Sequence, residues 1–376
     1  MHFALTSEQS QIQALAQEFA RDEILPLAVQ ADRTAQFPLQ IHRQALELGL
    51  LNTSLPSHLG GPGLGALELV LITEALCHAC LGIGTALCIN ALASEPLLLA
   101  GTPEQQKKYL GRLTDGAMAS FALTEPAAGS DVAGIRSRAQ RVSGGYSLSG
   151  SKIWISNASL AEFLIVFAKT EPDQGHKGMT AFIVPANAPG LSIGLPLSKL
   201  GQKAAPTNEV FMDQVFVPDA QRLGAEGSGF KLAMQVFDRS RPMVAAFGVG
   251  LTQRCLDEAL GYASQRHSMG SPILEHQAIA HKLAEMRVRL ESSRLLCYQS
   301  ACLLDAGKSN TLEAAMAKLH ASDSAMWAAS ETIQVMGGMG YSTEYPAEKL
   351  FRDAKVLQIY EGTSEIQKNI IARAMR

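Results

Sequence analysis

The chain has no excess of basic residues. Its 376 residues contain 32 lysines and arginines against 35 aspartates and glutamates, which gives a formal net charge of −3. Nucleic-acid-binding proteins usually carry a basic patch or tail, so this balance disfavours a non-catalytic helical scaffold or a nucleic-acid-associated protein. Hydrophobic residues make up 47% of the chain and charged residues 18%, a globular profile with room for two or three domains.

Targeting and membrane-spanning patterns are also lacking. The N-terminal stretch MHFALTSEQSQIQALAQEF has neither a charged start before an apolar core nor an Arg/Ser-rich presequence. It predicts a helix in which Thr6 and Gln9 occupy capping-box positions. The longest apolar run, 67–89, is interrupted by two glutamates and a histidine. We therefore expect a cytoplasmic, bacterial protein without a membrane span.

Cysteines are few, and they form no regular framework. Cys77 and Cys80 have the spacing of half a zinc site, but no second pair supplies the remaining ligands. Their surroundings, LVLITEALCHACLGIGTALCI, are apolar and favour buried helical cysteines. We expect reduced thiols and no metal site.

The composition changes twice along the chain. Residues 1–117 show apolar positions at helical spacing, residues 118–226 contain the β-rich runs FLIVFAKT, MTAFIVPA and EVFMDQVFVP, and residues 227–376 return to helical patterns such as TLEAAMAKLHASDSAMWAASETIQVM. Breaks in the first helical zone are expected at Pro26, Pro38 and Pro56. Helix, sheet and helix is not a βαβ alternation, so we predict three domains with these bounds and no doubly wound sheet.

One glycine-rich stretch imitates a dinucleotide fingerprint. GPGLGA (61–66) has the form G-x-G-x-x-A, but no strand precedes it and a proline interrupts it. The fingerprint works only between a strand and a helix. We predict a loop between helices at this place.

Two stretches near the middle of the chain suit ligand binding. FALTEPAAGSDV (121–132) combines the hydroxyls of Thr124 and Ser130 with small residues that let a ligand approach backbone amides. SKIWISNAS (151–159) places Trp154 and Ser156 two apart, and therefore on one side of a strand. A strand followed by a turn and a core tryptophan are the ordinary alternatives.

Two later stretches suit an anionic ligand. RHSMGSPILEHQ (266–277) offers the guanidinium of Arg266 for a phosphate, and Gly270 ends one helix before another begins. IQVMGGMGY (333–341) leads a helix into Gly337 and Gly338, with Gln334 one turn earlier, so backbone could pack against a flat or anionic group. A surface arginine and a glycine helix cap are the ordinary alternatives.

The stretch LQIYEGTSEIQ (357–367) holds two carboxylates four residues apart. On one helix Glu361 and Glu365 would share a face as two solvated acids. The other interpretation places Glu361 on the chain just before the helix, as a base directed into a pocket, and gives Glu365 a different task.

In their order and spacing these stretches resemble the acyl-CoA dehydrogenase family over nearly the whole chain. VFDRSRPMVAAFGVG, TEYPAEKLFRDAK and QIYEGTSEIQ look most like the medium-chain enzymes. The resemblance implies a mainly α fold: an N-terminal helical domain, a middle β-barrel-like sheet domain and a C-terminal four-helix bundle. It also implies FAD between the sheet domain and the bundle, partly held by a neighbouring subunit, in a homotetramer built as a dimer of dimers.

The resemblance also assigns residues to the cofactor and the substrate. The residues implied to contact FAD are Leu123, Thr124, Ser130, Trp154, Ser156, Thr363 and Glu365 and, across the subunit boundary, Arg266, Ser268, Gln277, Gln334, Gly337 and Gly338. The residues implied to contact the substrate are Ser130, Asp238, Arg241, Tyr360 and Gly362. Some relatives carry their base at the position of Ser240, where a serine cannot act as a carboxylate base, so the resemblance assigns the base to Glu361.

The implied reaction converts a saturated acyl-CoA to the trans-2-enoyl-CoA and passes electrons to an electron-transferring flavoprotein. Glu361 would take the α-proton while the β-hydrogen leaves as hydride, and burial should raise the pKa of this carboxyl. An oxidase or a flavin monooxygenase on the same fold is the alternative. Glu361 argues against the monooxygenase, which needs no α-proton base, while the oxidase stays open. Acyl chain length and branching are not specified by the sequence.

Overall fold

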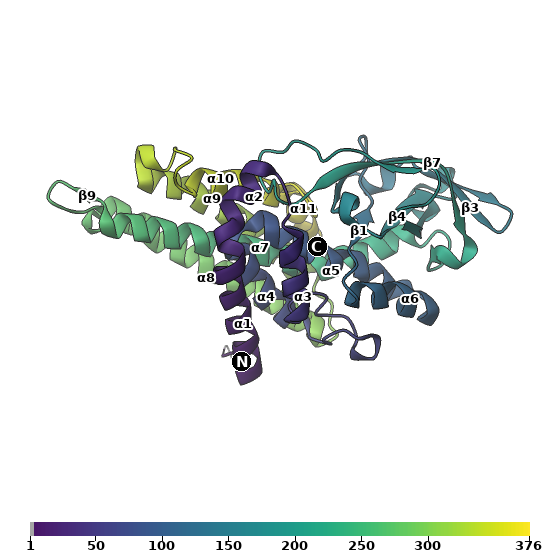
Figure 1. Cartoon of the computed structure of the whole chain (residues 1–376), viewed down its shortest axis with the longest axis horizontal. Coiled ribbons are helices and arrows are strands. Elements are labelled where there is room, and N and C mark those ends of the chain that lie inside the picture. Colours follow the sequence, from purple (N-terminus) through teal and green to yellow (C-terminus); the bar gives the residue numbers. More distant parts are fainter. Residues whose placement is uncertain (1–3) are drawn as a thin grey trace.

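Helices form the N-terminal part of the chain in the computed structural model, which describes residues 4–376 (Figure 1). They are α1 (Ser7–Phe19), α2 (Ala28–Thr34), α3 (Leu39–Glu47), α4 (Ala66–Ala79), α5 (Leu81–Ala100) and α6 (Pro103–Thr114). The predicted capping box is present, because the Thr6 hydroxyl accepts the N–H of Gln9 and the Gln9 side chain accepts the N–H of Thr6.

The expected break at Pro26 is wrong. The chain passes from α1 through a π-helical turn (Ala20–Ile24) and a 3₁₀ turn (Leu25–Leu27) into α2 without leaving the helical path. Proline is tolerated where a first turn begins, since its missing N–H would have no helical partner there. Pro38 and Pro56 do precede new helical segments, as predicted.

A mixed sheet occupies the middle of the chain, at one end of the molecule (Figure 1). Its strands are β1 (Ala119–Ala122), β2 (Arg138–Val142), β3 (Gly145–Ser156), β4 (Phe163–Lys169), β5 (Met179–Pro185), β6 (Leu191–Ile193), β7 (Thr207–Pro218) and β8 (Arg222–Leu223). The order is β6-β7-β3-β2-β4-β5-β8, and β1 adds to β4 in parallel. The three predicted β-rich runs are β4, β5 and β7, and β4 and β5 are buried almost throughout.

The C-terminal part is again helical. It contains α7 (Gly229–Gln265), the hairpin β9 (His267–Ser268) and β10 (Ser271–Pro272), α8 (Gln277–Asp305), α9 (Thr311–Met336), α10 (Ala347–Ala354) and α11 (Ser364–Ala374). Helices α7, α8 and α9 share one apolar core, to which α4 of the N-terminal part contributes. The hairpin lies at the opposite end of the molecule from β3 (Figure 1).

Helix α5 runs through the interior between these parts. It is long and apolar enough to cross a membrane, but 78% of its most apolar window is buried inside the protein, as in a core helix. Cys77 and Cys80 are buried free cysteines, as predicted, with Cys77 inside α4 and Cys80 at its C-terminal cap. The stretch GPGLGA is a loop up to Gly65, the N-terminal cap of α4, and no strand precedes it in the described part of the chain, as predicted.

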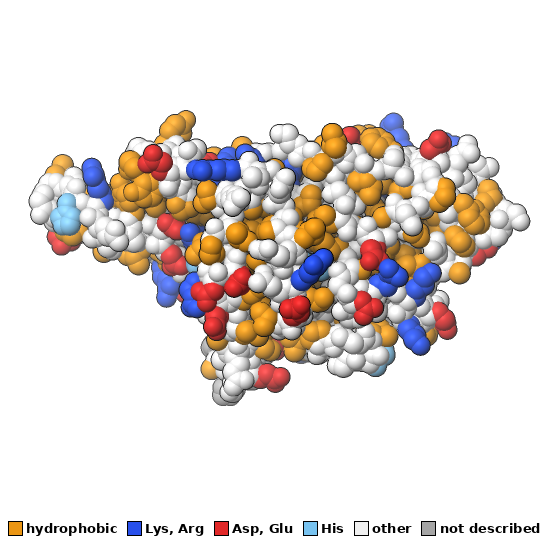
Figure 2. Space-filling model, in the orientation of Figure 1, with side chains coloured by type: hydrophobic (Ala, Val, Ile, Leu, Met, Phe, Trp, Pro, Cys, Tyr) orange, Lys and Arg blue, Asp and Glu red, His pale blue; other side chains and the backbone are white. Residues whose placement is uncertain are grey.

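The visible surface carries charges of both signs. Basic and acidic side chains are interspersed over the face drawn in Figure 2. Among residues 4–376 no cluster of three or more His, Cys, Asp or Glu side chains could hold a metal ion.

Candidate active site

Glu361 lies on a turn just before α11, as the sequence predicted. Its φ is +55°, and the following Gly362 has φ +89°. Helix α11 then starts at a proper cap, where the Thr363 hydroxyl accepts the N–H of Ile366 at 3.3 Å. Glu365 lies in the first turn of α11 with an exposed side chain, so the two carboxylates do have different surroundings.

The carboxyl of Glu361 is half-buried and has one neutral hydrogen-bond donor. Ser240 of α7 donates its hydroxyl to Oε2 at 2.9 Å. Burial raises the pKa of Glu361 above its usual value, and the Ser240 hydroxyl and the cations of Arg241 and Lys318 oppose this rise. The result is a carboxyl group that binds a proton more readily than a solvated one does.

Arg241 and Asp238 are tied together on α7. The buried Arg241 donates to Asp238 Oδ1 at 3.0 Å, and its Nε lies 3.5 Å from the carbonyl oxygen of Glu361. Asp238 Oδ2 accepts from the Thr311 hydroxyl at the start of α9, at 2.7 Å. Both side chains therefore brace the helices around Glu361, and their predicted contacts with the substrate stay predictions.

Tyr360 and Gly362 flank the carboxylate. The Tyr360 ring packs 6.4 Å from that of Phe247, and its hydroxyl lies 3.4 Å from the amide nitrogen of Gln202. A Cβ at Gly362 would come within 2.7 Å of the Gln367 amide nitrogen. The positive φ and this close approach together explain why the position is glycine.

The end of β3 and the loop after β1 form a second group of predicted residues. The N–H of Ile153 donates to the carbonyl of Thr124 at 3.0 Å, which brings these two segments side by side. Trp154 has φ +63° and is 56% exposed, while Ile155 is buried and Ser156 half-buried. The register of β3 against β7 shifts between Lys152 and Ile155, so regular strand alternation is interrupted at Trp154. That Trp154 and Ser156 share one side of the strand therefore stays a prediction.

The other two residues predicted in the 121–132 stretch are placed less directly. The Leu123 side chain is buried in the core, so its predicted contact with the flavin could be made only through its backbone. Ser130 is exposed on the loop.

A buried ion pair that the sequence did not reveal supports this loop. Lys152 Nζ lies 2.7 Å from Glu125 Oε1 and donates to the carbonyl of Leu123 at 3.0 Å. Glu125 also accepts the backbone N–H groups of Arg136 and Ser137, at 2.5 and 3.0 Å. Burial lowers the pKa of Lys152 to about 8, and the Glu125 carboxylate opposes this shift. The only signal was a lysine in a β-rich run, and no spacing rule connects it to an acid 27 positions earlier.

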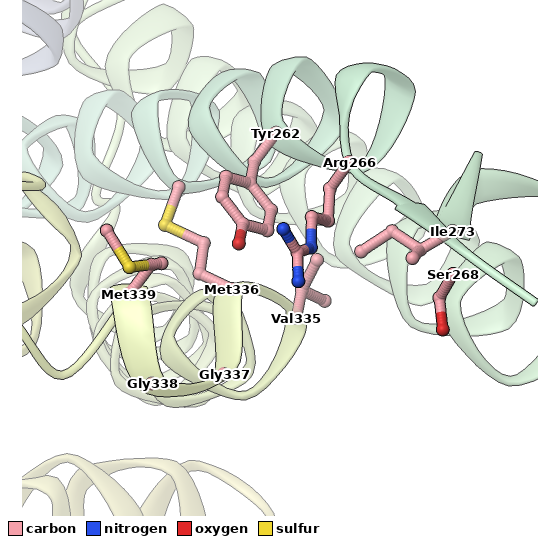
Figure 3. Close-up of a pocket in the computed structure, with 9 residues that line it drawn as sticks. All are labelled: Tyr262, Arg266, Ser268, Ile273, Val335, Met336, Gly337, Gly338 and Met339. Atoms are coloured by element: carbon pink, nitrogen blue, oxygen red, sulfur yellow. The ribbon is translucent and has the colours of Figure 1, made fainter.

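A third group lies in a depression of about 450 Å³ between the end of α7, the β9–β10 hairpin and the end of α9 (Figure 3). Of the predicted residues it is lined by Arg266, Ser268, Gly337 and Gly338. The Arg266 side chain points into the space above the turn at Gly337, where φ is +61°.

Two predicted residues lie outside this lining. Gln277 is exposed at the start of α8, and Gln334 is exposed near the end of α9. Neither is among the residues that line the depression.

These groups fit the two halves of FAD but lie far apart in one chain. An exposed tryptophan suits a flat ring system, while an arginine over a glycine turn suits a pyrophosphate. In Figure 1 the hairpin that carries Ser268 and the strand β3 that carries Trp154 lie at opposite ends of the molecule. The predicted contribution of a neighbouring subunit to the FAD site stays a prediction.

Comparison with known proteins identifies the family. Three family models match in succession: the acyl-CoA dehydrogenase N-terminal domain over residues 6–117, its middle domain over 120–215 and its C-terminal domain over 227–376. The chain belongs to the acyl-CoA dehydrogenase family. It is therefore a flavoprotein oxidoreductase that acts on CH–CH groups and depends on FAD.

Individual relatives cover almost the whole chain. A probable medium-chain specific acyl-CoA dehydrogenase of Caenorhabditis briggsae is 39% identical over 100% of this chain and 92% of its own. The solved structure of butyryl-CoA dehydrogenase from Megasphaera elsdenii is 36% identical, covers 100% of both chains and has a TM-score of 0.97. That of the prolyl acyl carrier protein oxidase AnaB is 33% identical, with a TM-score of 0.96 over 99% of this chain and 100% of that one.

Proposed function

We propose that the protein removes two hydrogens from a saturated acyl-CoA thioester and gives the trans-2-enoyl-CoA. The observation that carries this proposal is Glu361: a half-buried carboxylate of raised pKa, on a turn between Tyr360 and Gly362, held by Ser240. A base with a pKa nearer neutrality accepts a carbon-bound proton more readily than a solvated carboxylate does.

In the proposed reaction Glu361 takes the α-proton and the β-hydrogen leaves as a hydride. Bound FAD supplies the hydride acceptor. Two C–H bonds break, a C=C bond forms, and both bonding electrons of the β-hydrogen leave with it. Among residues 4–376 the N–H of Glu361 has no hydrogen-bond acceptor, so it is free to donate to the thioester oxygen as negative charge develops there.

The residues that would bind FAD are part of the proposal. Thr124, Trp154 and Ser156 would contact the flavin end, and Arg266 with the Gly337–Gly338 turn would contact the pyrophosphate end. Their separation in one chain supports an assembly in which one subunit completes the site of another, and we propose the homotetramer expected from the sequence.

The test is anaerobic mixing of the yellow protein with saturated acyl-CoA esters of increasing chain length. Bleaching of the flavin absorbance is expected, and the best ester defines the substrate. Glu361→Gln should keep the yellow colour and lose at least 10²-fold in bleaching rate, the order of magnitude of a positioned base. A Glu361→Gln variant that bleaches at the native rate would disprove the base assignment.

The acceptor separates two candidate functions. We propose an electron-transferring flavoprotein as the physiological acceptor, and the similarity to AnaB, an oxidase, favours oxygen as the second candidate. Oxygen consumption during turnover with acyl-CoA, at a rate equal to that with the flavoprotein, would favour the oxidase. A colourless purified protein would exclude both.

A further inference from the structure

The backbone carbonyl oxygens of Glu361 and Gly362 are approached by several side-chain hydrogen-bond donors. The Gln367 amide of α11 donates to the carbonyl oxygens of both Glu361 and Gly362, each at 3.0 Å. Lys318 of α9 donates its ammonium to the Gly362 oxygen at 2.7 Å, and Arg241 of α7 approaches the Glu361 oxygen. Three helices therefore hold one turn.

The conformation of that turn needs such support. Glu361 and Gly362 both have positive φ, and for Glu361, which has a Cβ, this is a strained conformation that persists only where its surroundings impose it. Without outside donors the peptide between the two residues could rotate toward a relaxed form. The carboxylate would then point elsewhere.

Lys318 is the least ordinary member of the group. Lysine is almost never fully buried unless it is paired, yet Lys318 is buried in the middle of α9. Within the described part of the chain the only hydrogen bond of its ammonium goes to the Gly362 oxygen. A helix that needed only packing here would carry an apolar side chain.

Lys318 also acts on Glu361 through its charge. The charged groups that face it are Glu361 on the turn, Arg241 on α7, Asp323 on α9 itself and Glu365 on α11. Burial lowers the pKa of Lys318 to about 8, so the ammonium is largely charged at neutral pH. The charged ammonium of Lys318 favours the ionised form of Glu361.

We propose that Lys318 and Gln367 are positioning residues for the dehydrogenation: they hold the Glu361–Gly362 peptide and so fix the direction of the Glu361 carboxylate, and Lys318 in addition supplies a positive charge beside it. This inference depends on the proposed role of Glu361 as the base. A misplacement of about 1 Å of a reacting group can cost about 10²-fold in rate, which sets the expected scale.

The experiment compares Lys318→Met and Gln367→Met as FAD-loaded proteins. Both should slow anaerobic flavin reduction by about 10- to 100-fold while the dissociation constant for acyl-CoA changes less than about threefold. Lys318→Met should also move the acid limb of the pH profile upward, because it removes a positive charge, whereas Gln367→Met should leave the limb in place. Because both residues bind the Gly362 oxygen, the double variant should lose less than the product of the single losses.

Two further variants control for general damage. Ser322→Ala alters a buried residue one turn along α9, whose hydroxyl bonds only within the helix, and it should match the native protein. Lys318→Gln keeps a hydrogen-bond donor without the charge. Compared with Lys318→Met it should regain part of the rate of flavin reduction, while the acid limb of its pH profile should stay shifted. It replaces Lys318→Met in the experiment if that variant does not fold. A crystal structure of Lys318→Met, or of Lys318→Gln in its place, should show that the Glu361 carboxylate no longer accepts the hydrogen bond from Ser240.

The outcomes are separable. If Glu361→Gln abolishes flavin reduction but the Lys318 and Gln367 variants behave like Ser322→Ala, the positioning inference is wrong and the proposed function stands. If Glu361→Gln bleaches at the native rate, the proposed function itself fails. If the acid limb of Lys318→Met stays in place, whatever the rate of flavin reduction, the proposal that the charge of Lys318 acts on Glu361 is wrong.

Discussion

Replacement of Ser240 by alanine is expected to make the candidate base harder to ionise. The Ser240 hydroxyl is the only neutral donor to the Glu361 carboxylate among the described residues, at 2.9 Å. Its hydrogen bond favours the charged form, and burial already favours the neutral one. The pKa of Glu361 should therefore rise further in Ser240→Ala.

The size of the effect follows from the strength of the bond. A hydrogen bond to a charged group contributes about 1.5–3 kcal/mol, and one pH unit corresponds to about 1.4 kcal/mol. The carboxylate is half-buried, and water can replace part of the lost bond, so we expect the lower end of this range. The acid limb of the rate profile should move upward by about one pH unit.

The assay is the second-order rate of anaerobic flavin reduction at low acyl-CoA, followed by stopped flow between about pH 5.5 and 9, because this quantity reports the free enzyme. Ser264→Ala is the matched control, since Ser264 lies on the same helix with an exposed hydroxyl bonded to the Leu260 carbonyl. A limb that stays in place or moves downward in Ser240→Ala, with the control unchanged, would refute the electrostatic description of the site.

Three further changes have outcomes set by the structure. Lys152→Met leaves the Glu125 carboxylate buried without its cation and should destabilise the protein by about 3–5 kcal/mol, measured by denaturant unfolding, and weaken FAD binding; equal stability would contradict the buried pair. Gly362→Ala adds a Cβ at φ +89° and 2.7 Å from Gln367, so flavin reduction should fall more than about tenfold with only about 1–3 kcal/mol lost in stability, and native kinetics would show that the turn is not constrained. Asp305→Ala removes the acceptor of two N–H groups at the start of α4 and should cost about 0.5–2 kcal/mol by thermal unfolding without altering flavin reduction.

Much of the fold could be predicted because its signals are local. The apolar spacing of TLEAAMAKLHASDSAMWAASETIQVM coincides with α9, and the three β-rich runs coincide with β4, β5 and β7. The helical start at Thr6 and the turn before α11 were also visible, since caps and glycines act within a few residues.

The support of the candidate site could not be predicted, because it depends on partners far apart in sequence. Glu125 meets Lys152 only once β1 and β3 lie in one sheet, and Lys318 meets Gly362 only once α9 packs against the final turn. Buried lysines in the sequence look like any others. The wrong prediction at Pro26 has a local cause. Proline usually ends an α-helix, but here the chain changes from a π-helical turn to a 3₁₀ turn and continues into α2.

Two residues of the candidate site adopt a backbone conformation that their residue type disfavours. Trp154 and Glu361 both carry a Cβ, and both have positive φ. Such strain costs about 1–3 kcal/mol at each residue and needs compensation from the surroundings. For Glu361 the compensation is visible in the donors from α7, α9 and α11; for Trp154 it is the Lys152–Glu125 pair and the bond from Ile153 to Thr124. Because buried charge stabilises a fold poorly, two buried lysines beside two strained residues are better explained by the fixed geometry of the site than by stability.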